Sequence, residues 1–243
     1  DLYYRHRPKK PVSAVIYTHS HVDHYGGVKG VTTQDDVNAG KVAVIAPDGF
    51  LEEAASENVY AGTAMGRRAL YHTGAILPKG ERGQVDDGLG KTASLGASTL
   101  IAPTDTINAT GDTRTVDGVE MEFQMAPGTE APAEMLIYFP QFKVLNAAED
   151  ATHNVHNLYT LRGAQVRDAK TWWKTLNTAI ERYGDRTDVV IAQHHWPMWD
   201  RERVNRFLAD QRDLYKYIHD QTLNLANKGY TSVEIAKRLK LPK

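Results

Sequence analysis

The sequence contains no cysteine among its 243 residues. Disulfide bonds and thiolate ligands are therefore excluded, and any metal ion must be bound by histidine, aspartate or glutamate. The absence is compatible with either a reducing or an oxidising compartment. The sequence also has no apolar run near the roughly 20 residues that a membrane-spanning helix needs, so we expect no membrane span.

An excess of charge of either sign is missing as well. The 29 Lys and Arg residues balance 30 Asp and Glu residues, which leaves a formal net charge of −1. This balance gives no electrostatic reason to expect binding to nucleic acid or to an anionic membrane. Hydrophobic residues make up 41% of the chain, which is ordinary for a globular protein long enough to bury its own core.

One short segment, residues 18–27, carries a dense group of metal-ligand residue types. It reads Thr-His-Ser-His-Val-Asp-His-Tyr-Gly-Gly and directly follows an apolar run that predicts a buried strand. Alternate residues of an extended backbone point the same way, so His19 and His21 can bind one ion. Asp23 and His24 follow the bend at the end of this extended segment, so their side chains are expected to point away from the ion bound by His19 and His21. The pattern predicts two metal ions side by side, because imidazole and carboxylate are ligands for zinc and similar metals.

The rest of the chain predicts alternating strands and helices. Apolar or alternating runs predict strands over residues 12–17, 41–47, 119–125, 135–139, 143–146 and 189–192. Helical periodicity predicts helices over residues 48–71 with a break, over 172–183, and from residue 200 onward with a stop at Gly229. An Asp-Gly pair at residues 117–118 predicts a hairpin turn. The order indicates α/β layers up to residue 198, followed by a helical segment.

A two-metal site needs further ligands from other strand ends. Three turns of the predicted sheet offer histidine or carboxylate side chains. The pairs of neighbouring alternatives are Glu130 and Glu134, Glu149 and Asp150, and His194 and His195. Each of these side chains has an alternative explanation, as a solvent-exposed group or as a hydrogen-bond partner of a ligand.

Together these segments resemble the alkylsulfatases of the metallo-β-lactamase superfamily, enzymes that hydrolyse detergents such as dodecyl sulfate. The resemblance rests on the His-x-His-x-Asp-His loop, the Pro-Gly-Thr-Glu-Ala-Pro turn at residues 127–132, Asn-Ala-Ala-Glu at 146–149 and Gln-His-His at 193–195. Related hydrolases usually have histidine after the Pro-Gly pair and aspartate or cysteine at the later bridging strand. Here both positions are glutamate.

The resemblance implies a fold and a domain organisation. Residues 1–198 are expected to form a metallo-β-lactamase αββα sandwich, incomplete at its N-terminus, as the catalytic domain. Residues 199–243 are expected to be the start of a dimerisation region. Because the first residue is Asp and the first predicted strand follows almost at once, we expect the sequence to be part of a longer precursor.

The resemblance also implies a ligand set for two zinc ions per subunit. The ligands implied for one ion are His19, His21 and Glu130. The ligands implied for the other ion are Asp23, His24 and His194, and Glu149 is implied to bridge the two ions. Glu130 is preferred over Glu134, although spacing alone leaves both open. Two glutamates would lower the net positive charge of a dimetal centre that holds an anionic ester.

Residues 153–167 follow the bridging position and are expected to pass close to the metals. The planar guanidinium of arginine matches the geometry of a sulfate group, and the resemblance implies sulfate binding by Asn157, Arg162 and Arg167. His153 and His156 are alternatives for a general acid or for a hydrogen-bond partner of a ligand. The catalytic residues that we expect are Asp23, Glu149 and His153.

The implied reaction is zinc-dependent hydrolysis of linear alkyl sulfate esters to the alcohol and inorganic sulfate by a metal-activated water. A thioesterase, lactonase or β-lactamase of the same fold is the alternative, since a fold does not fix a substrate. The resemblance further implies a homodimer formed through the C-terminal helices and favours a periplasmic or secreted location. Residues 73–98, rich in glycine and small polar residues, are expected to form a lid over the site.

Overall fold

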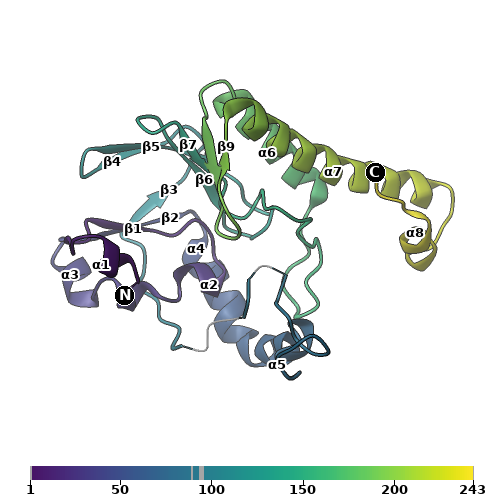
Figure 1. Cartoon of the computed structure of the whole chain (residues 1–243), viewed down its shortest axis with the longest axis horizontal. Coiled ribbons are helices and arrows are strands. Elements are labelled where there is room, and N and C mark those ends of the chain that lie inside the picture. The colour runs from purple at the N-terminus through teal and green to yellow at the C-terminus, as the bar shows by residue number, and fades with distance from the viewer. Residues whose placement is uncertain (1, 89, 93–95, 243) are drawn as a thin grey trace.

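The computed structural model describes residues 2–88, 90–92 and 96–242. Two β-sheets pack face to face, and helices cover their outer faces (Figure 1). The first sheet is parallel and consists of β1 (Ala14–Ile16), β2 (Ala43–Pro47) and β3 (Asp105–Ile107). The second is mixed and consists of β4 (Thr113–Val116), β5 (Val119–Met125), β6 (Met135–Phe139), β7 (Val144–Asn146), β8 (Val189–Ile191) and β9 (Met198–Trp199), in this spatial order. The predicted αββα sandwich is confirmed.

The helices lie in two groups along the chain. Those in the first half are α1 (Leu2–His6), α2 (Val22–Tyr25), α3 (Gln34–Asn38), α4 (Phe50–Ala55) and α5 (Gly62–His72), with a 3₁₀ turn η1 (Val28–Gly30) and a π-helical turn η2 (Ser56–Tyr60). The others are α6 (Ala169–Tyr183), α7 (Arg201–Asn227) and α8 (Ser232–Arg238). The predicted break between residues 48 and 71 is η2. None of the described helices is long and apolar enough to cross a membrane.

The core fills the spaces between these layers. Between the two sheets, Ile45 and Ile107 of the first sheet belong to one buried cluster with Phe123, Met135 and Ile137 of the second. Each of these side chains is at most 2% exposed. Burial of apolar side chains of this size stabilises a fold by about 1.5–3 kcal/mol each, so this layer fixes the two sheets against one another.

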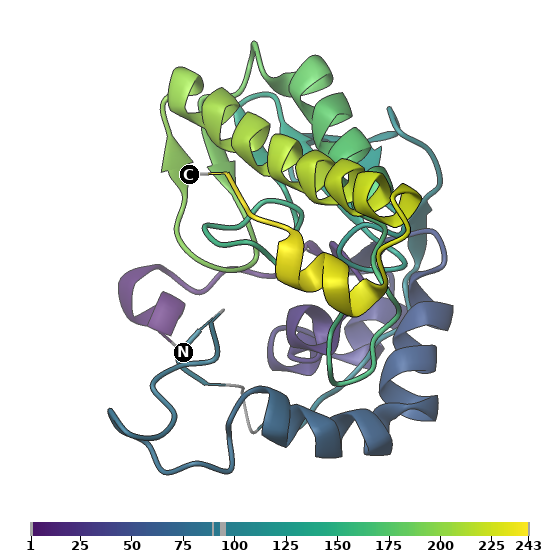
Figure 2. The same cartoon turned by 90° about the vertical axis from the view of Figure 1, so that its right-hand side faces the viewer.

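Helix α7 belongs in part to the core. Its Val204, Leu208 and Tyr215 are buried against α6 and the second sheet, and the Tyr215 ring stacks on Trp172 with a centroid distance of 4.3 Å. Beyond this region α7 leaves the body of the molecule, and α8 folds back beside it as an arm (Figures 1 and 2). The predicted boundary at residue 198 therefore falls just before a helix that packs into the sandwich and continues outside it.

Strand direction brings several loops to one edge of the sandwich. Strands β5, β7 and β8 run the same way in the second sheet, so their carboxyl ends meet at that edge. The chain that leaves β1 joins them, because Met135 N donates to Thr18 O (2.9 Å) and Ser20 N donates to Ala133 O (3.1 Å). The histidine-rich loop of the first sheet thus lies against the turns of the second.

Candidate metal centre and anion site

Seven potential metal ligands from this edge form two neighbouring groups. In each group the ligand atoms lie within 4.8 Å of one another. The first group is His19, His21, Glu130 and Glu149, and the second is Asp23, His24 and His194. The first group is buried, whereas Asp23 of the second is exposed. The residues come from the segment after β1, which includes α2, and from the loops after β5, β7 and β8. These are the places predicted from the sequence.

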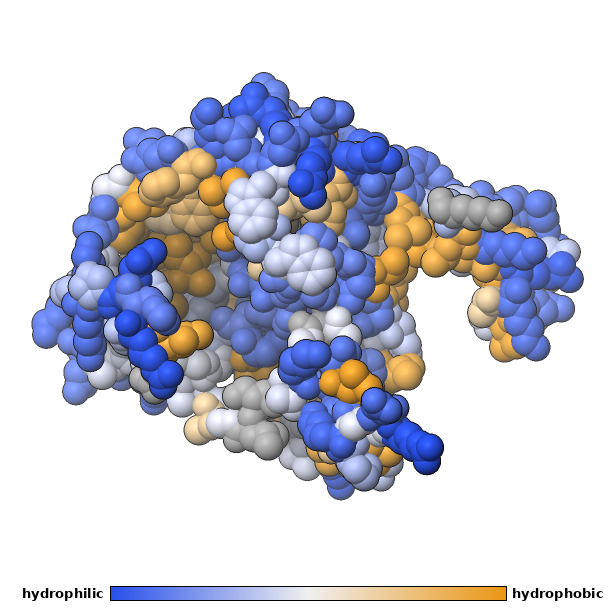
Figure 3. Space-filling model, in the orientation of Figure 1, coloured by the Kyte–Doolittle hydropathy of each residue, from blue (hydrophilic) through white to orange (hydrophobic). Residues whose placement is uncertain are grey.

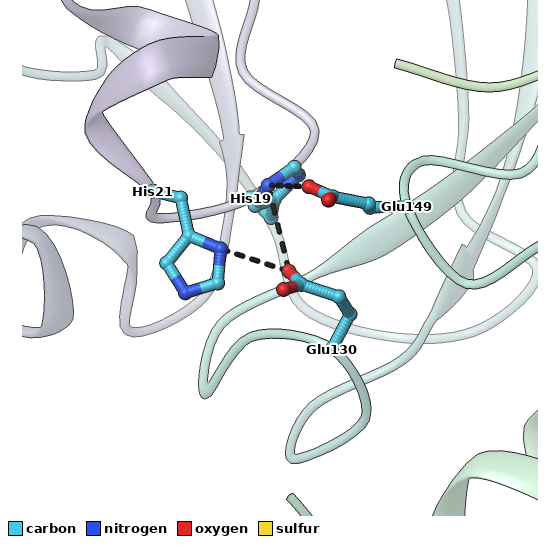
Figure 4. Close-up of side chains that lie close together, drawn as sticks. All are labelled: His19, His21, Glu130 and Glu149. Atoms are coloured by element: carbon cyan, nitrogen blue, oxygen red, sulfur yellow. Dashed lines mark ion pairs between the residues drawn. The ribbon is translucent and has the colours of Figure 1, made fainter. Parts of the chain in front are cut away.

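The first group centres on two glutamates (Figure 4). His21 Nδ1 lies 2.8 Å from Glu130 Oε2. His19 Nε2 lies 3.7 Å from the same oxygen and 3.4 Å from Glu149 Oε2. The facing nitrogens and oxygens thus converge on a small volume from three loops.

The second group continues from Glu149. Asp23 Oδ2 lies 3.1 Å from His24 Nε2 and 3.4 Å from His194 Nε2. Glu149 Oε2 is 3.0 Å from His24 Nε2, and its Oε1 is 3.6 Å from His194 Nε2. Glu149 therefore contacts both groups, which is the position that a bridging carboxylate would take.

The residues present fit divalent metal ions. His19 Nε2 and Glu130 Oε2 are buried, and apart from the ion-pair contacts given above they make no well-directed hydrogen bond within the described part of the chain. A buried polar atom in this state costs free energy unless a partner satisfies it. A cation placed between them would satisfy both, and imidazole with carboxylate is a donor set that zinc accepts.

The surroundings of His19 and Glu130 keep both side chains in the protonation states that bind a metal ion. Burial removes water from the His19 ring and lowers its pKa to about 4, although Glu149 opposes the shift. Burial alone would raise the pKa of Glu130, but the charges of His21 and Arg167 outweigh it and lower the pKa to about 2. A neutral imidazole and an ionised carboxylate follow, both able to bind a cation.

Glu134 lies behind the first group. Its Oε2 accepts hydrogen bonds from Thr129 Oγ1 (2.9 Å) and Ala131 N (2.8 Å). Its Oε1 lies 3.9 Å from His19 Nδ1, the ring nitrogen on the other side from Nε2 and the two glutamates. The hydrogen-bond partner of His19 Nδ1 is instead Thr18 Oγ1 (3.0 Å), and Glu134 Oε1 accepts from Glu149 N (3.2 Å). The geometry therefore favours Glu130 over Glu134 as the ligand from this turn.

The alternatives Asp150 and His195 also fall outside both groups. Asp150 is 1% exposed, and burial raises the pKa of its carboxyl well above the ordinary value. His195 Nδ1 accepts a hydrogen bond from His153 N (3.2 Å). The backbone of His195 has a φ of 70°, and that of Ala148 has a φ of 49°. Each of these strained residues adjoins a side chain of the candidate centre, as is common at functional sites.

The two histidines of the following segment have different surroundings. His153 stacks on Trp196 (centroids 4.5 Å apart) and packs against Phe207, outside both groups. His156 Nε2 instead lies 3.1 Å from Glu149 Oε1 and 3.4 Å from Glu130 Oε1. The histidine next to the candidate metal ligands is thus His156, whereas the predicted catalytic residue His153 lies away from them.

Arg167 is buried against the cluster. Its guanidinium forms an ion pair with the Glu130 carboxylate and donates to the backbone oxygen of the same residue. It also donates to Asn157 Oδ1 (2.7 Å) and Thr160 Oγ1 (2.5 Å). Asn157 and Arg167, both predicted to bind sulfate, therefore lie together beside Glu130, and most of the Arg167 donors are already used.

Arg162 reaches the cluster through a residue that sequence reasoning missed. Its NH2 lies 2.7 Å from Oε1 of Glu57, whose Oε2 lies 3.4 Å from His21 Nε2. Glu57 is in the π-helical turn η2, away from every motif in the sequence. A cavity of about 30 Å³, the size of a water molecule, is lined by His21, Glu57 and Arg167 among others.

Among its described residues, the predicted lid approaches the site at Gly88. Gly88 O accepts a hydrogen bond from Asn154 Nδ2 (3.1 Å) and lies 3.4 Å from His195 Nε2. At the other end, Thr99 N donates to Gly26 O (2.7 Å) of the histidine-rich loop. Leu89 and residues 93–95 lie outside the described residues, and the covering role of this segment stays a prediction.

The chain was compared with known proteins. Residues 1–194 match the profile of the metallo-beta-lactamase superfamily. The chain is 60% identical over its full length to a linear primary-alkylsulfatase of Pseudomonas sp., of which it covers 36%. It is 57% identical over 99% of its length to an alkyl/aryl-sulfatase of Saccharomyces cerevisiae, of which it covers 37%.

A solved structure gives the same result. The stereoselective inverting sec-alkylsulfatase Pisa1 from Pseudomonas sp. matches the whole chain with a TM-score of 0.97 and 54% identity, and 38% of that protein is covered. The chain thus spans little more than a third of the length of these relatives. The resemblance to alkylsulfatases is confirmed, and since the matched profile includes the loops of the whole cluster, the chain belongs to the metallo-β-lactamase superfamily.

Proposed function

We propose that this protein hydrolyses linear alkyl sulfate esters to the alcohol and inorganic sulfate at a dinuclear zinc centre. The observation that carries the proposal is the contact between the arginine segment and the metal cluster, made by Arg167 at Glu130 and by Arg162 through Glu57. Zinc binding and anion binding would then occur side by side. The alkylsulfatase names of relatives at 54–60% identity support the same chemistry.

The proposed ligand set follows the two groups. His19, His21 and Glu130 would hold one zinc ion, Asp23, His24 and His194 would hold the other, and Glu149 would bridge them. The contacts of Glu149 with both groups support its bridging role, and the position of Glu134 behind His19 supports Glu130 as the turn ligand.

Arg162 is the best placed donor for the sulfate group. Its NH1 is buried and lacks a hydrogen-bond partner within the described residues. An unsatisfied guanidinium donor is costly, and an anionic sulfate oxygen would satisfy it. Arg167 would contribute mainly by holding Glu130 and Asn157 in place, since its donors are used there.

The chain's own groups can also move a proton. When bound, the zinc pair would activate a water molecule and polarise the ester. His156 Nε2 lies within hydrogen-bond reach of Glu149 Oε1, so this imidazole can hold a proton at the edge of the site or pass it on. His153 stays an alternative for this role, although its stacking on Trp196 supports it less well.

A substrate panel tests the proposal. Purified protein with measured zinc content is assayed against a primary and a secondary alkyl sulfate, an acyl thioester, a lactone and a β-lactam. We expect zinc-dependent release of inorganic sulfate and an activity on the primary alkyl sulfate that exceeds the other activities. Turnover of the thioester, lactone or lactam without sulfate release would favour the alternative hydrolases and overturn the proposal.

We further propose that the C-terminal arm mediates homodimerisation. Apolar side chains line the concave side of the arm formed by α7 and α8 (Figure 3). Leu223, Val233 and Leu241 are at least half exposed, and exposed apolar groups of this kind often mark interfaces. Light scattering should give the mass of a dimer, whereas a monomer at all concentrations would contradict this part of the proposal.

A further inference from the structure

Glu57 is a partly buried carboxylate outside every sequence motif of the site. It lies in η2, the π-helical turn between α4 and α5, and its side chain is 11% exposed. A π-turn inserts an extra residue into a helix and redirects the side chains around it, frequently at functional sites. Here the redirected side chain faces His21 and Arg162.

The two carboxylate oxygens of Glu57 contact different partners. Oε2 lies 3.4 Å from His21 Nε2, while the other ring nitrogen, Nδ1, lies 2.8 Å from Glu130 in the cluster. A ligating histidine usually donates its outer N–H to a carboxylate, which fixes the tautomer and the ring orientation. Glu57 is therefore placed to keep Nδ1 of His21 free for a metal ion.

Oε1 of Glu57 holds the anion-binding candidate. It lies 2.7 Å from Arg162 NH2 and leaves NH1 of the same guanidinium without a partner within the described residues. The backbone of Arg162 is held as well, because Arg68 NH1 donates to its carbonyl oxygen (2.9 Å). One nitrogen of the guanidinium is thus paired with Glu57, and the other is a buried donor that no described residue satisfies.

We propose that Glu57 is a positioning residue that couples the metal centre to the anion site. It would orient His21 for the zinc ion and Arg162 for the sulfate group with one carboxylate, so that loss of Glu57 weakens both. This inference rests on the proposed function. It adds a residue and a linkage that none of the sequence motifs contains.

Glu57→Gln tests the coupling, since the amide keeps the shape but offers only one acceptor oxygen. We expect zinc affinity, measured by competition with a chromophoric chelator, to fall about 10- to 100-fold. Binding of decane sulfonate, an anion with the same head group and no ester to cleave, should weaken at least about tenfold in calorimetry. The visible spectrum of the cobalt-substituted protein should also change, because the His21 ring loses its fixed orientation.

Glu53→Gln is the matched control. Glu53 lies on the preceding α4, carries the same charge and contacts the same arginine segment through Gln165 (3.2 Å). Its variant should leave both affinities and the cobalt spectrum unchanged. If Glu57→Gln does not fold, Glu57→Asp replaces it, because the shorter side chain keeps the charge and can reach only one of the two partners.

A double-mutant cycle separates the two contacts. In an Arg162→Ala background, Glu57→Gln should have no further effect on sulfonate binding and its full effect on zinc affinity. Unchanged affinities in every Glu57 variant that folds, next to a wild-type protein that binds zinc and cleaves alkyl sulfate, would overturn this inference alone. A wild-type protein that neither binds sulfonate nor releases sulfate would instead overturn the proposed function.

Discussion

His156 Nε2 lies 3.1 Å from Glu149 Oε1, the carboxylate that contacts both halves of the cluster. Its other ring nitrogen, Nδ1, lies 3.0 Å from the backbone oxygen of Asn157. The ring therefore lies between Glu149 and the start of the segment that we propose to bind the anion.

Replacing His156 tests its role beside Glu149. His156→Ala should reduce the rate of alkyl sulfate hydrolysis about 10- to 100-fold, because the bridging carboxylate loses its hydrogen-bond partner. His153→Ala is the control, since that ring packs on Trp196 and Phe207, and its effect should be smaller. A larger loss in His153→Ala would return the catalytic role to His153.

The two glutamates of the turn after β5 can be separated by zinc content. Glu130→Gln should lose zinc, because the carboxylate faces His19 and His21. Glu134→Gln should retain it, since burial raises the pKa of Glu134 well above its ordinary value and the neutral amide resembles the protonated acid. Elemental analysis of both variants after buffer exchange measures their zinc content and shows which glutamate is the ligand. The opposite result would make Glu134 the ligand.

Zinc affinity should rise with pH. Burial disfavours a charge on His24, but Asp23 and Glu149 outweigh it and raise its pKa to about 10 in the metal-free protein. Because the pKa is raised, the proton stays bound throughout the neutral range and zinc must displace it. His19, with a pKa of about 4, is already neutral there and releases no proton.

We therefore expect the zinc dissociation constant to decrease by about tenfold per pH unit near neutrality for the His24 proton alone. The decrease is steeper where His21 and His194, whose pKa values are also raised, release protons as well. Calorimetry in buffers of different ionisation enthalpy counts the protons released. Zinc uptake without proton release would contradict the raised pKa of His24.

Loss of Arg167 should mainly reduce the stability of the protein, whereas loss of Arg162 should mainly weaken anion binding. Arg167→Ala leaves the buried Glu130 charge without its cation and should destabilise the protein by about 3–5 kcal/mol. Arg162→Ala removes a partly exposed side chain and should mainly weaken sulfonate binding. Urea unfolding and sulfonate titration of both variants measure the two effects. Equal stability losses would show that Arg167 has no special structural role.

The first half of α7 should behave as core and the second half as surface. Leu208→Ala should destabilise the protein by about 2–5 kcal/mol, because Leu208 is fully buried. Leu223→Ala is the matched control further along the same helix, where the side chain is 50% exposed, and should change stability by less than about 0.5 kcal/mol in the monomer. Thermal unfolding at low protein concentration compares them.

The strands of the fold that were predictable are those with a clear periodic pattern. The alternation over residues 119–125 matches β5, and the Asp-Gly turn before it has positive φ at both residues, 52° and 77°. Strands β3 and β9 were missed because they are short and fall outside the apolar or alternating runs from which strands were predicted. Their pairing comes from neighbours distant in sequence.

Some residues of the candidate site could likewise be predicted from the sequence, and others could not. The His-x-His-x-Asp-His loop is readable because its ligands are adjacent in sequence, and Glu130, Glu149 and His194 follow at strand ends. His153 was chosen over His156 as a catalytic residue, because the stacking that holds His153 on Trp196 and Phe207 is a tertiary contact that the sequence does not show. Glu57 was unpredictable because only the π-turn directs it toward His21 and Arg162.

Helix α7 has 27 residues and is about 40 Å long at 1.5 Å per residue. Midway along it, Gln211 donates to the backbone oxygen of Thr152 (2.9 Å), and Tyr215 OH lies 3.5 Å from that of His156. The helix therefore supports the loop that carries His156 at its middle and extends from there into the distal arm. Whatever holds the distal arm in place is therefore connected by one continuous helix to the loop beside Glu149.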